Sequence, residues 1–278
     1  MHQMIPTEYW IYLATGTLAG ILSGMFGVGG GTIVVAILSA VFIQLGFSPL
    51  HIMHLAIGTS LATIVLTSIS SARAHNRQHN VDWMLVLKIA PAIIIGALLG
   101  SALAAKLHSF WLSLIFAIFI LVIATQLLLK NTKKSNPVKI DLSNDVMPHQ
   151  QKYVFFAGLI IGSFSSLVGI GGGSLSVPYL MANKWDMRRA IGTSAAIGLP
   201  IALAGALGYL INGLHVAHLP STSIGFIYLP ALIGISLSSI LTAPLGAKLA
   251  QKLPIPTLRK LFALLLYLVG INMLWHLF

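Results

Sequence analysis

The stretch Phe26-Gly27-Val28-Gly29-Gly30-Gly31-Thr32, here called the first cassette, interrupts an apolar run that covers residues 9–45. The pattern returns as Val168-Gly169-Ile170-Gly171-Gly172-Gly173-Ser174, the second cassette, inside an apolar run over residues 153–182. So dense a cluster disfavours helix, because each glycine costs about 1 kcal/mol relative to alanine. In lipid, the backbone groups freed by a broken helix must be buried in protein or line a cavity. The paired breaks therefore predict a binding site built largely from backbone, as in many secondary transporters.

The composition excludes an ordinary soluble protein. Of 278 residues, 57% are hydrophobic and 8% are charged, and apolar segments of about 20 residues follow one another with short polar breaks. The sequence therefore predicts an all-α polytopic membrane protein. We assign the net charge of +11 to cytoplasmic loops, where Lys and Arg collect in membrane proteins, and not to nucleic-acid binding. The absence of cysteine excludes disulfides, thiolate metal sites and catalytic thiols.

The chain consists of two repeats. Ala56-Ile57-Gly58-Thr59-Ser60 follows the first cassette, and Ala190-Ile191-Gly192-Thr193-Ser194 follows the second. Two further pairs recur in the same order, Pro91-Ala92 with Pro230-Ala231 and Ala105-Lys106-Leu107 with Ala247-Lys248-Leu249. Landmarks in matching order indicate internal repetition. We therefore divide the chain into a first transmembrane repeat (1–130), a cytoplasmic linker (131–151) and a second transmembrane repeat (152–278).

The basic residues indicate how the cassette segments fold. If each cassette segment crossed the membrane once, the 16 Lys and Arg residues would divide equally between the two faces. If each is a re-entrant hairpin instead, all of them except Lys106 lie on one face. Lys and Arg concentrate on the cytoplasmic side, so we expect each half to contain a broken-helix hairpin and three transmembrane helices. An odd number of crossings inverts the second repeat and places both termini outside the cytoplasm.

A helix that starts at each cassette would present free N–H groups and the positive end of its dipole. Glycine lets a ligand approach this backbone closely, so the cassettes predict a neutral site for a small oxyanion. Hydroxyls of the cassettes and of the Gly-Thr-Ser motifs would complete it. The predicted substrate-binding residues are Gly27, Gly29, Gly30, Gly31, Thr32, Thr59, Ser60, Gly169, Gly171, Gly172, Gly173, Ser174, Thr193 and Ser194. The alternative is that these residues serve only close helix packing and bonds within their own helices.

The titratable residues separate two kinds of transport. The five acidic residues lie at segment ends or in the linker, at Glu8, Asp82, Asp141, Asp145 and Asp186. This argues against a carboxylate proton relay and a carboxylate cation site. Any coupled proton would then be carried by a histidine, for which His75 is the candidate, or by the substrate itself. Histidine pairs at helical spacing can bind metal, but these lie at segment ends without an acidic or cysteine partner. The pairs are His51/His54, His75/His79 and His215/His218.

The duplicated Phe-Gly-x-Gly-Gly-Gly-like cassette, followed each time by Ala-Ile-Gly-Thr-Ser, resembles the TauE/SafE family of sulfite exporters. The resemblance covers nearly the whole chain and implies a permease of the bacterial inner membrane. It implies sulfite, sulfoacetate, thiosulfate, a sulfonate or a related organic acid as substrate, moved in either direction. We expect a small anion and membrane lipid as partners, with a homodimer as one allowed assembly. We expect no cofactor, no resident metal, no catalytic residue and no nucleic acid.

These features together predict a secondary transporter, not an enzyme, that moves a small sulfur-containing oxyanion by alternating access. Three other interpretations stay open. A divalent metal permease would use the histidine pairs. An intramembrane enzyme would need a nucleophile with a partner base, and the sequence gives no hint of a base for its serines. An assembly or anchoring protein would bind no small ligand at all.

Overall fold

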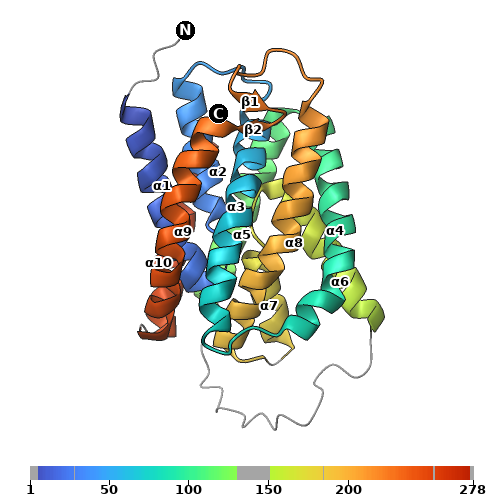
Figure 1. The fold of residues 1–278 in the computed structure, drawn as a ribbon, viewed down its shortest axis with the longest axis vertical. Helices are drawn as coiled ribbons and strands as arrows, with labels where there is room; N and C mark the ends of the chain where they lie inside the picture. Colours follow the sequence, from blue (N-terminus) through green and yellow to red (C-terminus); the bar gives the residue numbers. More distant parts are fainter. Residues whose placement is uncertain (1–5, 28, 130–150, 184, 253, 276–278) are drawn as a thin grey trace.

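The structure is a computed structural model that describes residues 6–27, 29–129, 151–183, 185–252 and 254–275. Most of the predicted linker and Val28 of the first cassette lie outside the described residues. The described chain forms helices packed side by side and one short β-hairpin (Figure 1). The helices are α1 (Pro6–Phe26), α2 (Gly31–Gln44), α3 (Ile52–Asn76), α4 (Trp83–Lys106), α5 (Ser109–Leu129), α6 (Gln151–Val168), α7 (Gly173–Ala182), α8 (Met187–Gly213), α9 (Leu229–Lys252) and α10 (Ile255–Trp275). The hairpin pairs β1 (Ser223–Ile224) antiparallel with β2 (Ile227–Tyr228).

The prediction of an all-α polytopic membrane protein is confirmed. Six described helices are long and apolar enough to cross a membrane, namely α1, α3, α4, α5, α8 and α9. The apolar helix α2 and the apolar parts described for α6 and α10 are shorter. A helix satisfies its backbone hydrogen bonds internally, and this makes it one of the two structures that can span lipid.

Helices α3 and α8 form the centre of the bundle. Their most apolar windows are 78% and 67% buried, against 50% or less for the other four candidate spans. The two helices run antiparallel (Figure 1), because the start of α3 and the end of α8 meet at the same residue. The His54 ring of α3 lies 4.9 Å from the Phe226 ring, and a Cβ on Gly213 of α8 would collide with the Phe226 amide.

Both cassettes break a helix at mid-height of this bundle. α1 ends at Phe26 and α2 begins at Gly31, while α6 ends at Val168 and α7 begins at Gly173. The 10 residues of α7 reach only about 15 Å as helix, which is half of a hydrocarbon core of about 30 Å. The first break lies against Ile64, midway along α3, so the chain turns back inside the bundle.

The hairpin of each half packs on a helix of the other half. α1 lies along α9, and α6 lies along α4. Glycines make both contacts close, because a side chain on Gly24 would collide with the Ala243 carbonyl and one on Gly162 with the Ile93 carbonyl. Small residues let membrane helices approach in this way. Packing is therefore the role of many glycines outside the cassettes.

Candidate functional site

The two cassettes meet at the centre of the molecule. A Cβ on Gly29 would lie 3.2 Å from the Gly171 Cα, and one on Gly31 would collide with the Gly169 carbonyl oxygen. Only glycine permits so close a crossing of two backbones. The structure thus brings Gly29 and Gly31 of the first cassette beside Gly171 and Gly169 of the second, whereas Gly27 and Gly30 face Ile191 of α8 and Ala19 of α1.

The cassettes share a sequence pattern but differ in conformation. The first has left-handed φ angles at Gly27, Gly29 and Gly30, of 68°, 76° and 70°, whereas the second has one at Gly169, of 76°. Gly30 is the N-cap of α2 in a left-handed conformation, while the N-cap of α7, Gly172, is right-handed with φ of −49°. A residue with a side chain is strained at Gly30 but not at Gly172.

Each cassette ends at the start of a helix. In α2 the Ile33 amide donates to the Gly30 carbonyl at 3.2 Å, and in α7 the Leu175 amide donates to the Gly172 carbonyl at 3.2 Å. The amides that precede them have no carbonyl of their own helix to bond. Neither N-cap residue forms a side-chain cap. Two helix N-termini with their partial positive charge therefore start in the membrane interior.

The serines of the Gly-Thr-Ser motifs lie at the cassettes, as expected. The Ser60 hydroxyl donates to the Gly169 carbonyl at 2.9 Å and lies 3.4 Å from the Gly31 carbonyl, so it joins the two cassettes. The Ser194 hydroxyl lies 2.9 Å from the Ser176 hydroxyl, which donates to the Gly172 carbonyl. Both serines are fully buried.

The threonines of the same motifs lie elsewhere. The Thr59 hydroxyl accepts a hydrogen bond from the Tyr228 amide at 2.9 Å, and the Thr193 hydroxyl accepts one from the Asp82 amide at 3.0 Å. Thr59 thereby fixes the residue before α9, and Thr193 fixes the residue before α4. The structure does not bring these hydroxyls to the cassettes, because each one instead bonds a loop amide. We call the Thr59–Tyr228 hydrogen bond the Thr59 clasp and the Thr193–Asp82 hydrogen bond the Thr193 clasp.

The glycine of each motif completes its clasp. A Cβ on Gly58 would collide with the Phe226 carbonyl, and one on Gly192 with the Asn80 carbonyl. At each end of the bundle, the glycine of a Gly-Thr pair therefore packs closely against a loop of the opposite repeat, and the threonine accepts a hydrogen bond from that loop. This is a structural use of a motif that sequence analysis assigned to ligand binding.

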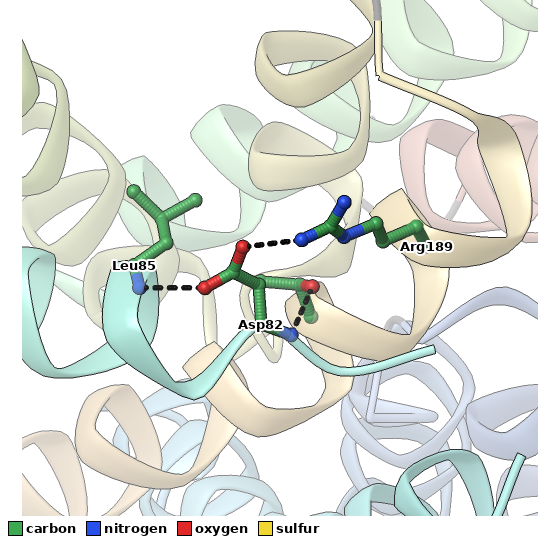
Figure 2. A network of polar contacts seen from close by, with 4 residues as sticks. Asp82, Leu85 and Arg189 are labelled. Atoms are coloured by element: carbon green, nitrogen blue, oxygen red, sulfur yellow. Dashed lines mark hydrogen bonds and ion pairs between the residues drawn. The ribbon is translucent and has the colours of Figure 1, made fainter. Parts of the chain in front are cut away.

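A surface ion pair extends the Thr193 clasp (Figure 2). One carboxylate oxygen of Asp82 lies 2.7 Å from the Arg189 guanidinium, and the other accepts from the Leu85 amide at 3.0 Å. The Arg189 guanidinium also lies over the Trp185 ring, 5.0 Å from its centroid. The two charged side chains are 37% and 20% exposed, so the pair itself contributes little to stability.

His75, the candidate for proton coupling, is buried at the last turn of α3. Its Nε2 lies 2.8 Å from the Gly24 carbonyl, so Nε2 carries the proton that makes this hydrogen bond. Its Nδ1 has no partner among the described residues. The ring lines a small pocket together with Met25, Arg188 and Ile191, at the same end of the bundle as the Thr193 clasp.

The histidine pairs do not assemble a metal centre in the described residues, where no group of three or more His, Cys, Asp or Glu side chains could hold a metal ion. The His51 and His54 rings lie 6.0 Å apart, and the His54 Nε2 lies 3.1 Å from the Ala104 carbonyl. His51 precedes α3, and partial burial together with the nearby His218 lowers its pKa.

Sequence reasoning missed three residues next to the second cassette. Ser176 bonds both the cassette and Ser194, while Ser68 of α3 and Gly198 of α8 face each other beside Gly172. For Ser176 and Gly198, the available signal in the sequence was that they differ from the residues at the equivalent positions of the first repeat. Ser176 stands where the first repeat has Val34, and Gly198 stands where it has Ile64.

Apolar spans around two helix breaks that meet inside the bundle are typical of secondary transporters. The chain belongs to the sulfite exporter TauE/SafE family, whose model matches residues 12–273. This membership confirms the resemblance found in the sequence.

Similar sequences are also described as membrane transporters. A probable membrane transporter protein of Haemophilus influenzae is 36% identical over 263 residues, which cover 94% of this chain and 96% of the relative. A probable membrane transporter protein of Methanocaldococcus jannaschii is 28% identical over 271 residues, covering 95% and 94%. YdhB of Bacillus subtilis, with the same description, is 25% identical over 265 residues, covering 93% and 97%. No solved structure matches this chain significantly.

Proposed function

We propose that this protein is a secondary transporter that moves a small sulfur-containing oxyanion or organosulfonate, such as sulfite or sulfoacetate, across the bacterial inner membrane. The observation that carries the proposal is the meeting of two helix breaks, at Gly29 and Gly171, inside the bundle. The first amides and the positive dipole end of α2 and α7 favour an anion there. The family description, sulfite exporter, supports the sulfur-containing substrate class.

The carboxylates support an anionic substrate. Asp82 and Asp186 cap the starts of α4 and α8, and Glu8 lies in the first turn of α1. All described carboxylates therefore lie at helix ends. A carboxylate proton relay or a carboxylate cation site would place one inside a span.

Two features support alternating access. The Thr59 clasp and the Thr193 clasp hold loops at opposite ends of the antiparallel helices α3 and α8. The crossed packing of α1 on α9 and α6 on α4 is the exchange expected of two inverted repeats. In this mechanism one clasp opens while the other stays closed, so that the cassettes face one side at a time. The positive-inside rule orients the protein with its linker in the cytoplasm and both termini outside.

His75 would couple a proton to the anion. Its unpartnered Nδ1 can accept a proton while Nε2 keeps its bond to the Gly24 carbonyl. The pocket beside it would let a proton arrive from the side that carries Arg188.

Reconstitution into proteoliposomes tests the proposed function. Uptake of labelled sulfite, sulfoacetate and thiosulfate is measured and compared with uptake by protein-free vesicles. Zn²⁺ and Mn²⁺ are tested in the same vesicles, both as competitors of the anions and as substrates. We expect saturable flux of at least one of the anions, with competition among them and none from the metals. Saturable metal flux without anion flux would support the metal permease instead, and vesicles as tight as the protein-free ones would overturn transport of these anions.

A further inference from the structure

Helices α3 and α8, which carry the Gly-Thr-Ser motifs, pack on the two cassettes differently. Ile64 and Gly198 hold the same position in the two repeats, six residues after Gly58 and Gly192. Ile64 is fully buried and covers the first cassette, since a Cβ on Gly29 would lie 2.9 Å from its Cγ2. At the second cassette, Gly198 has no side chain, and the neighbouring Ile197 and Ile201 of α8 pack on Gly172 instead, 3.1 and 2.7 Å from where its Cβ would lie.

Gly198 instead places two hydrogen-bond donors around one point beside the start of α7. A Cβ on Gly198 would lie 2.8 Å from the Ser68 Oγ, 3.8 Å from the Ser68 Cβ and 3.9 Å from the Gly172 amide nitrogen. Ser68 comes from the opposite repeat and is 1% exposed. A buried hydroxyl and a backbone amide next to a helix N-terminus therefore converge where the first repeat has the Ile64 side chain.

Ser174 adds a third donor in the first turn of the 10-residue helix α7. It is 6% exposed, and its hydroxyl has no hydrogen-bond partner among the described residues. A buried polar group without a partner costs about 1–3 kcal/mol, and proteins seldom leave one without a reason. In the first repeat, by contrast, the Ser60 hydroxyl donates to the Gly169 carbonyl. Ser174 is thus a buried hydroxyl without a partner among the described residues, at the start of the helix that follows the second cassette.

We propose that the two cassettes have different roles, and that the anion binds at the start of α7 between Ser174, Ser68 and the Gly172 amide. The first cassette, covered by Ile64, is the structural joint on which the second cassette rests. This assignment rests on the proposed function and narrows it to one binding point for each chain. The donors are neutral, so the site suits a compact oxyanion whose oxygens accept several hydrogen bonds and which can leave again.

Anion-induced thermal stabilisation of the full chain in detergent tests this assignment, with sulfite and methanesulfonate as probes. Ser174→Ala removes the free donor, and Gly198→Ala displaces the Ser68 hydroxyl with the smallest side chain. Tyr209→Phe is the matched control, because it removes another buried hydroxyl without a partner, in the C-terminal part of α8. Thr32→Val changes the residue of the first cassette that corresponds to Ser174. The melting temperature without ligand checks the folding of each variant.

We expect Ser174→Ala and Gly198→Ala each to raise the apparent Kd about tenfold or more, which is the loss of one hydrogen bond to an anion. Tyr209→Phe should change it less than about twofold, and Thr32→Val should have a smaller effect than Ser174→Ala. A wild-type protein that neither probe stabilises would overturn the proposed function and this assignment with it. A stabilised wild type with unchanged affinity in Ser174→Ala and Gly198→Ala, or with an equal loss in Thr32→Val, would overturn the assignment alone.

Discussion

The Thr193 hydroxyl accepts a hydrogen bond from the Asp82 amide at 3.0 Å, across 111 residues of sequence. The equivalent hydroxyl of the first repeat, Thr59, accepts one from the Tyr228 amide at 2.9 Å. Each threonine thus holds the start of a helix that belongs to the other repeat. The halves are joined at both ends of the bundle by the same chemistry.

Thr193→Val should weaken this joint. Valine keeps the shape of threonine but leaves the half-buried Asp82 amide without this acceptor, and the loss of such a hydrogen bond costs about 1 kcal/mol. We expect a melting temperature lower by a few degrees and faster, less saturable flux in proteoliposomes. Thr59→Val is the matched variant at the other end and should behave alike. Unchanged melting in both variants would show that the clasps do not hold the fold.

The Asp82–Arg189 ion pair should contribute much less than the hydroxyl. Asn retains capping ability at a helix N-terminus, so Asp82→Asn removes the charge and leaves the cap. In a double-mutant cycle with Arg189→Gln, we expect a coupling energy below about 1 kcal/mol that falls further as salt is added. A salt-independent coupling of several kcal/mol would mean that the pair is shielded from solvent in the membrane.

Gly30 and Gly172 should differ in their tolerance of alanine. A Cβ on Gly30 would meet the Ala19 Cβ at 2.7 Å and collide with its carbonyl, at a φ of +70°. A Cβ on Gly172 would meet the mobile end of Ile201 at 2.7 Å, at a right-handed φ. Gly30→Ala should therefore destabilise the protein by about 2 kcal/mol or more, and Gly172→Ala by much less. Thermal unfolding of the two purified variants measures the difference, and equal melting temperatures would contradict it.

The charge state of His51 should make stability depend on pH. Partial burial, and then the nearby His218, lower the pKa of His51 from its ordinary value of 6.5. The unfolded chain therefore binds a proton at a higher pH than the folded protein does, so His51 protonation favours unfolding. Stability is full above pH 6.5 and falls as the pH drops below it. His51→Gln should flatten this part of the melting-temperature profile, with His79→Gln as a control; an unaltered slope would exclude His51 as its source.

His75→Gln tests the proposed coupling. The Gln amide can donate to the Gly24 carbonyl as the His75 Nε2 does, but it does not titrate. We expect anion counterflow to persist while uptake driven by a pH gradient is lost. The readout is the ratio of these two fluxes in the same vesicles. If the pH gradient still drives uptake in this variant, the proton is carried elsewhere.

Much of the fold could be predicted from the sequence. Apolar length gave most of the spans, and the glycine clusters gave both helix breaks, because both signals are local. The partner of a hydroxyl is not local, and for this reason Thr59 and Thr193 were assigned to the ligand although they bind loop amides. The symmetry of the repeat predicts two equal half-sites, and this stays a prediction. The two halves differ in detail, because Gly198 stands where the first repeat has Ile64 and Ser176 stands where it has Val34.

The packing of α1 on α9 affects how the protein is made. The face of α1 that carries Gly24 packs on α9, which is present only after residues 229–252 have been synthesised. In an early intermediate this face must therefore contact lipid or the insertion machinery. The contact of α6 with α4, by contrast, is available as soon as α6 emerges. The first hairpin therefore reaches its final packing only late in synthesis, when α9 is in the bilayer. A chain that stops before α9 should be recognised by membrane proteases as incomplete.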